Sequence, residues 1–181
     1  MTVIEQLAGP PALAEAIAGQ IMREYLAWVG HRFTADHGVV FDDMDAAIAA
    51  HHREFTQELP RLLGPRGRLL VARANSKVVG VGALKPVDSK VAEIKRMYVR
   101  RDARGQGIGR AILDTLLTEA GTIGYHVARL ETAKFMREAH ALYRSRGFQN
   151  TPMFDHTEAG LSGLESFMLF MELRLEHAAR V

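Results

Sequence analysis

The feature that most constrains this chain is a glycine-rich segment, RRDARGQGIGRAILDTLLTEAG, at residues 100–121. Three glycines fall there at alternate positions, and an apolar stripe of helical spacing follows at once. The preceding residues 91–99, VAEIKRMYV, read as a strand, and residues 126–133, HVARLETA, read as another. A strand, a crossover helix and a second strand make a βαβ unit, so these two strands are predicted to be parallel.

The rest of the chain predicts one domain built around this unit. The element order is ααβββαβαββ, with TVIEQ as an extra leading strand, which indicates an α/β (α+β) fold with a mostly antiparallel mixed sheet. Residues 30–43 read as a polar loop, and Pro60 is expected to end the second helix. Helices are predicted at 12–29, 43–59, 107–120 and 137–147, and strands at 68–74, 78–87, 91–99, 126–133, 148–154 and 166–175.

The glycine loop is predicted to bind an anion. A helix start offers unpaired backbone N–H groups and the positive end of the helix dipole. Glycines allow an anion to approach those groups closely. Four arginines flank the glycines, at positions 100, 101, 104 and 110. The alternative is a tight strand-to-helix turn that holds no ligand.

The spacing of the glycines separates three classes of ligand. The phosphate loop of nucleotide hydrolases needs G-x-x-x-x-G-K-[ST], and no such lysine is present. The dinucleotide fingerprint needs G-x-G-x-x-G after a buried parallel strand, whereas Glu93, Lys95 and Arg96 lie in the strand here. The pattern R-x-x-G-x-G, formed by Arg104, Gly107 and Gly109, is typical of the pyrophosphate loop in proteins that use acyl-coenzyme A.

Composition excludes several other classes. The chain has no cysteine, which excludes disulfides, thiolate metal sites and a cysteine nucleophile. The net charge of +2 gives no reason to expect nucleic-acid binding, and no apolar run approaches the roughly 18 residues that a membrane span needs. The opening MTVIEQLAGPP lacks the basic start and apolar stretch of a signal peptide. We therefore expect a cytoplasmic protein that binds neither nucleic acid nor membrane.

The segment AEIKRMYVRRDARGQGIGRAIL, followed further along by EAHALYRSRGF, resembles the GNAT family of N-acetyltransferases. The resemblance covers residues 68–173, including the order of the elements. It implies the GNAT fold, in which the two parallel strands splay apart and helices flank the sheet. Residues 1–60 match only in being two helices, which in this family are the variable acceptor-side elements. The implied organisation is a single acetyltransferase domain over 1–181, with the acetyl-CoA-binding core at 68–173.

The resemblance implies acetyl-CoA as co-substrate and no metal. The loop and helix start would bind its pyrophosphate, and the end of strand 91–99 would pair with the pantetheine amides as an added strand. A backbone N–H near Met97 or Tyr98 would act as the oxyanion site. The expected cofactor-binding residues are Met97, Tyr98, Val99, Arg104, Gly105, Gln106, Gly107, Ile108, Gly109, Arg110, Thr132, Met136 and Ala139.

One position departs from the family pattern. Many members carry an asparagine three residues before the alanine that Ala139 matches, and here that position is Met136. The side-chain hydrogen bond to pantetheine is therefore absent. Either Thr132 or backbone groups replace it, or the cofactor arm is held less tightly.

The resemblance also implies a base and an acid. An attacking alkyl amine, with a pKa of about 10.4, must lose a proton, and the leaving thiolate should gain one. Glu93 is the candidate base, and it shares a face with Lys95, Met97 and Val99 if no bulge interrupts the strand. A surface carboxylate paired with Lys95 or Arg129 is the alternative. Tyr143 is the candidate acid near the coenzyme sulfur, with a core aromatic residue as the alternative.

The predicted activity is acetyl transfer from acetyl-CoA to a primary amine of a small molecule or peptide, by direct attack in a ternary complex. A non-catalytic acetyl-CoA sensor and a nucleotide-binding protein are the alternatives. The acceptor would approach an acidic cluster in 36–45 and the loop 155–165, which carries Asp155, His156 and Glu158. Family members are often dimers, so a homodimer is also among the expected partners.

Overall fold

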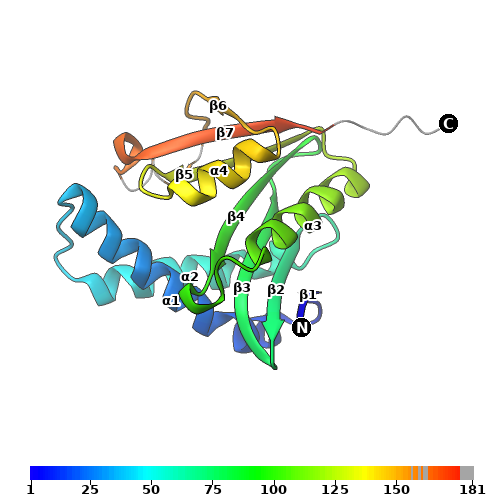
Figure 1. The fold of residues 1–181 in the computed structure, drawn as a ribbon, viewed down its shortest axis with the longest axis horizontal. Coiled ribbons are helices and arrows are strands. Elements are labelled where there is room, and N and C mark those ends of the chain that lie inside the picture. The colour runs from blue at the N-terminus through cyan, green and yellow to red at the C-terminus, as the bar shows by residue number, and fades with distance from the viewer. Residues whose placement is uncertain (156, 159, 161–162, 176–181) are drawn as a thin grey trace.

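The protein folds around one seven-stranded sheet in the order β1-β2-β3-β4-β5-β7-β6, as the computed structural model shows (Figure 1). The structure describes residues 1–155, 157, 158, 160 and 163–175. The strands are β1 Thr2–Gln6, β2 Arg68–Ala74, β3 Lys77–Pro86, β4 Val91–Val99, β5 Val127–Ala133, β6 Gln149–Thr151 and β7 Met168–Arg174. The helices are α1 Pro11–His37, α2 Met44–Leu62, α3 Ile108–Ile123 and α4 Arg137–Ser145, with short 3₁₀ helices at Arg101–Ala103 and Glu165–Phe167.

The predicted element order and mixed sheet are confirmed. β4 and β5 are parallel, as expected for strands joined by the crossover helix α3, and all other neighbouring strands are antiparallel. Helices cover both faces, because each face carries its own apolar cluster. One cluster joins α3 and α4 to the sheet, and the other joins α1 and α2 to the opposite face. Within the part of the chain that the structure describes, no helix is long and apolar enough to cross a membrane.

The helices α1 and α2 are longer than predicted. α1 continues through Gly30 to His37 and ends at Gly38, whose φ of 65° is left-handed. Gly30 is a packing position and not a helix breaker, because a Cβ there would lie 2.6 Å from Met44 Sδ. α2 also continues past Pro60 to Leu62, because Leu62 is fully buried and packs in the core. Tertiary packing thus outweighs the local glycine and proline signals.

A β-bulge interrupts β4 at Arg96. Opposite Gly82 of β3, the strand β4 has two residues, Arg96 and Met97, and Arg96 has a φ of 58°. Glu93, Lys95, Met97 and Val99 were expected to share a face only if no bulge interrupted the strand, and this condition is not met beyond Lys95. After the bulge, Met97 and Val99 pack against the α3-side cluster, whereas Tyr98 packs against the α1-side cluster.

The parallel ladder between β4 and β5 is short. It pairs Val91 with Val127, Ala92 with Ala128 and Glu93 with Arg129, and no pair continues it along these two fully described strands. The strands therefore separate toward their C-terminal ends, as expected for a splayed pair. The β4 edge from Ile94 to Val99 faces this gap.

Candidate active site

The glycine loop presents open backbone at the start of α3. Gly105 and Gly107 both have a φ of 77°, a left-handed conformation that glycine adopts without the penalty of a Cβ atom. Gly107 is the N-cap of α3, and no atom lies within 4 Å of a Cβ built at either glycine. The N–H groups of the first turn have no intrahelical acceptor. This loop can therefore accept an anion from the solvent side.

A groove of about 390 Å³ runs from this loop toward the gap between β4 and β5; we call it the loop groove. Several residues predicted to bind the cofactor line it, together with Trp28, Arg32 and Phe135. Those predicted residues are Met97, Tyr98, Val99, Arg104, Gly105, Gly107, Ile108, Gly109, Met136 and Ala139, and the predicted acid Tyr143 lines the groove as well. Gln106 on the loop and Arg110 in the first turn of α3 are exposed beside the groove.

Arg104 turns back over the end of β4. Its Nε donates to the Val99 carbonyl oxygen at 3.0 Å. Its guanidinium carbon lies 5.2 Å from the Trp28 ring centroid and 5.8 Å from that of Tyr98. The arginine thus occupies the mouth of the loop groove, where it interacts with one strand edge and two aromatic faces.

A second cavity, of about 140 Å³, lies between α1 and α2 on one side and β4 and β5 on the other; we call it the helix cavity. It shares three lining residues with the loop groove: Met97, Met136 and Tyr143. The two cavities therefore meet at the gap between the strands. Thr132 and Glu93 line the helix cavity, and the Thr132 hydroxyl donates to Met136 Sδ at 3.6 Å.

Tyr143 is the side chain common to both cavities that carries an ionisable hydroxyl. It is buried on α4, and its ring packs against that of Phe148 with centroids 5.8 Å apart. Burial, together with the nearby phenol of Tyr25, raises the pKa of Tyr143 well above its usual value. The hydroxyl therefore keeps its proton at neutral pH.

Glu93 is buried at the closed end of the gap. Its carboxylate lies 3.7 Å from Lys95 Nζ and 3.8 Å from Arg129 Nη2. Lys95 and Arg129, the two cations that were considered as alternative partners of Glu93, are thus both in contact with it. A second carboxylate, that of Glu131, lines the same cavity two residues beyond Arg129 on β5 and accepts the backbone N–H of Glu158 at 2.8 Å.

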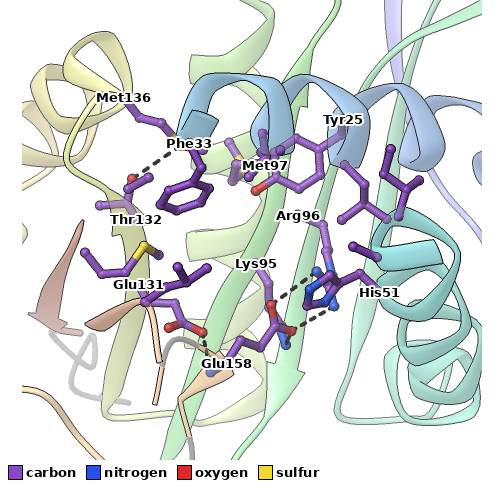
Figure 2. Close-up of a pocket in the computed structure, with 18 of the residues that line it drawn as sticks. Tyr25, Phe33, His51, Lys95, Arg96, Met97, Glu131, Thr132, Met136 and Glu158 are labelled. Carbon is purple, nitrogen blue, oxygen red and sulfur yellow. Dashed lines mark hydrogen bonds and ion pairs between the residues drawn. The ribbon is translucent and has the colours of Figure 1, made fainter. Parts of the chain in front are cut away.

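Sequence reasoning missed a buried charge network beside the helix cavity (Figure 2). Lys95 Nζ lies 3.0 Å from Glu58 Oε1 and 2.6 Å from Glu158 Oε1. Arg96 Nη2 bridges the same two carboxylates at 3.3 and 2.8 Å. The sequence does contain a signal of this network, the charged residues of EIKR within an otherwise apolar strand. Charges buried in a strand need oppositely charged partners.

The network determines the ionisation of its members. Burial alone would raise the pKa of Glu58, but Lys95, Arg96 and a hydrogen bond from Lys85 outweigh it and lower that pKa to about 2. Burial also opposes the charge of Lys95, yet Glu158 and the other carboxylates hold its pKa above the usual value. All of these groups are therefore charged at neutral pH.

Two residues of the acidic cluster in 36–45 make local contacts. Asp43 caps α2 by accepting the Ala46 N–H at 2.9 Å, and Asp36 pairs with Arg32 at 2.5 Å. His51 lines the helix cavity and contacts Glu54 at 3.0 Å. His156 lies outside the described residues. Among the residues that the structure describes, no cluster of three or more His, Cys, Asp or Glu side chains could hold a metal ion.

Comparisons with known proteins agree with this geometry. The family model described as the acetyltransferase (GNAT) family matches residues 40–148. An IAA acetyltransferase from Azospirillum brasilense is 38% identical over 116 residues, which cover 64% of this chain and 72% of that protein. The PaiA N-acetyltransferase from Thermoplasma acidophilum, solved in complex with coenzyme A, aligns with a TM-score of 0.69 at 17% identity, over 96% of this chain and 99% of that one. The protein yncA from Salmonella typhimurium, solved with its cofactor acetyl-CoA, aligns with a TM-score of 0.62 at 22% identity, over 100% and 98%.

The fold, the glycine loop and the family match define an acyltransferase. The matched segment spans more than half of the chain and contains β4, the loop, α3, β5 and α4. The chain belongs to the GNAT family of acetyltransferases, as the sequence resemblance predicted.

Proposed function

We propose that this chain transfers an acetyl group from acetyl-CoA to a primary amine by direct attack in a ternary complex. The observation that carries the proposal is the meeting of the loop groove and the helix cavity at Met97, Met136 and Tyr143. A donor in one cavity and an acceptor in the other would bring their reactive ends together there. In this proposal residues 1–181 work as a single domain, with residues 1–60 on the acceptor side.

The residues of the loop groove fit acetyl-CoA. Open backbone N–H groups from Gln106 to Arg110 suit its pyrophosphate, and the unpaired edge of β4 at Met97–Val99 suits the pantetheine amides. Arg104 would give up its hydrogen bond to the Val99 carbonyl, which would then be open to the ligand. The arginine would instead neutralise phosphate charge. Thr132 and Ala139 would flank the arm, and Met136 would contribute an apolar contact in place of the usual asparagine.

The side chains at the junction would handle the protons. When bound, acetyl-CoA supplies an acetyl thioester; a C–N bond to the acceptor forms as the C–S bond breaks. A backbone N–H near Met97 or Tyr98 would stabilise the charge that develops on the acetyl oxygen. Glu93 would take the proton of the amine through water, because its carboxylate is buried. Tyr143, which stays protonated, would donate to the leaving sulfur.

Glu131 is the second candidate for the base. It lines the same cavity and lies on β5 beyond the last ladder pair, and therefore beside the gap. Glu93 already contacts two cations, Lys95 and Arg129. Mutation of each carboxylate in turn would show which of the two acts as the base.

Thermal unfolding and thiol release test the proposal together. Coenzyme A and acetyl-CoA should raise the melting temperature, whereas ATP and NAD should not. Thiol release from acetyl-CoA should then depend on an added amine. Failure of coenzyme A to stabilise the protein would contradict the proposed donor site. Binding without turnover of any amine would favour a non-catalytic acetyl-CoA sensor.

A further inference from the structure

We propose that the acceptor is a primary amine carried on one uncharged apolar group about the size of an aromatic ring. The inference rests on the proposed acetyl transfer and deepens it by naming the class of acceptor. It follows from three properties of the helix cavity: its walls, its volume and the pairing of its charges.

The walls of the helix cavity are apolar on the side of the two N-terminal helices. Leu26, Val29 and Phe33 of α1 face it, and so do Phe41, Met44 and Ile48 from the following turn and α2. Such a surface stabilises a ligand mainly by removing apolar area from water. Tyr25 of α1 and His51 of α2 are the polar side chains that these two helices add to the lining.

The volume of the helix cavity limits the size of that group. At about 140 Å³ it is close to an engineered apolar cavity of about 150 Å³ that binds benzene. One aromatic ring or a branched alkyl group of similar size therefore fits. The long chain of a polyamine would exceed this space.

Four charged side chains that line the helix cavity, those of Glu93, Lys95, Arg96 and Glu158, are already paired within the protein. Lys95 and Arg96 are 8% and 6% exposed, and both contact Glu58 and Glu158. A second ammonium or a carboxylate on the acceptor would lose its hydration without gaining an unopposed counter-charge. The cavity therefore disfavours polyamines and free charged amino acids.

The orientation of the acceptor follows from the shared end of the two cavities. Figure 2 shows Met97, Met136 and Phe33 toward one end of the helix cavity, and Glu131, Lys95 and Glu158 toward the other. The amine nitrogen must reach the shared end, near Met97 and Met136, because the donor groove opens there. The apolar body then lies along the walls of α1 and α2, beginning at Phe33 near the shared end.

A panel of amines tests this class. Initial rates of thiol release at saturating acetyl-CoA give kcat/KM for 2-phenylethylamine, ethylamine, spermidine and lysine. We expect 2-phenylethylamine to exceed each of the others by at least about 10-fold. Equal or faster acetylation of spermidine or lysine would overturn this inference and leave the proposed acetyl transfer intact. Acetylation of no amine by a protein that still binds coenzyme A would overturn both.

A matched pair of variants tests the location. Ala47 lines the helix cavity, whereas Ala49 is exposed on the same helix. Ala47→Leu should lower kcat/KM for 2-phenylethylamine by at least about 10-fold more than it lowers kcat/KM for ethylamine. Ala49→Leu should change neither value. An equal loss for both amines in Ala47→Leu would contradict the helix cavity as the acceptor site. If that variant is unstable, the amine panel on the wild-type protein still tests the class of acceptor.

Discussion

Glu93 and Arg129 form the last residue pair of the parallel ladder between β4 and β5, and their side chains approach to 3.8 Å between Glu93 Oε2 and Arg129 Nη2. Beyond this pair the strands separate, and both cavities open into the gap. The ion pair therefore lies at the closed end of the space in which acetyl transfer is proposed.

The base can be identified by comparing Glu93→Gln with Glu131→Gln. We expect Glu93→Gln to lower kcat/KM for a reactive amine about 100-fold at pH 7, because the amine then lacks a proton acceptor. The loss should shrink as the pH approaches the pKa of the amine, since more of the amine is then neutral. A large loss confined to Glu131→Gln would instead make Glu131 the base.

Removal of the Tyr143 hydroxyl should slow the chemical step. Tyr143→Phe is expected to lower kcat about 100-fold with little change in coenzyme A affinity, because the leaving sulfur loses its proton donor. Tyr125→Phe is the matched control: that hydroxyl donates to the Arg66 carbonyl at 2.9 Å, away from both cavities. It should cost about 1 kcal/mol of stability and leave kcat unchanged. Unchanged turnover in Tyr143→Phe would contradict the acid role.

The left-handed glycine at the N-cap of α3 should be required for donor binding. Gly107→Ala forces a side chain into a φ of 77°, which should cost about 1 kcal/mol of stability and weaken coenzyme A binding at least about 10-fold by calorimetry. Gly121 lies inside the same helix with free space around it. Gly121→Ala should therefore stabilise the protein by about 0.5–1 kcal/mol and leave the affinity unchanged. Equal affinities in both variants would exclude the loop as the phosphate site.

The pKa of Glu58 predicts a pH dependence of stability. Because that pKa is lowered from 4.5 to about 2, its contribution is complete above pH 4.5 and is lost as the pH falls toward 2. Glu58→Gln should reduce the free energy of unfolding in denaturant by about 3 kcal/mol at pH 7, and the difference from wild type should shrink between pH 4.5 and 2. Glu54→Gln on the same helix should have a small effect. A difference that does not vary with pH would contradict the network's role.

The sequence predicted the parts of the site that depend on local chain geometry. The glycine spacing, the strand before it and the helix after it determine the loop, and these lie within one βαβ unit. The position of Tyr143 followed from the family resemblance. The structure places both at the loop groove.

The parts that sequence could not supply depend on contacts between distant residues. The bulge at Arg96 changes the facing of Met97, and the partners of that arginine, Glu58 and Glu158, lie 38 and 62 positions away. The extension of α1 past Gly30 likewise depends on the approach of Met44 from the next helix. The spacing of apolar residues within β4 or α1 does not predict these contacts with distant residues.

The central claim is tested most directly by a crystal structure of the protein with bound coenzyme A. We predict the pyrophosphate at the first-turn N–H groups of α3, and the sulfur in the gap between β4 and β5, beside Met97, Met136 and Tyr143. Coenzyme A bound outside this gap, or with its sulfur away from Tyr143, would contradict the account.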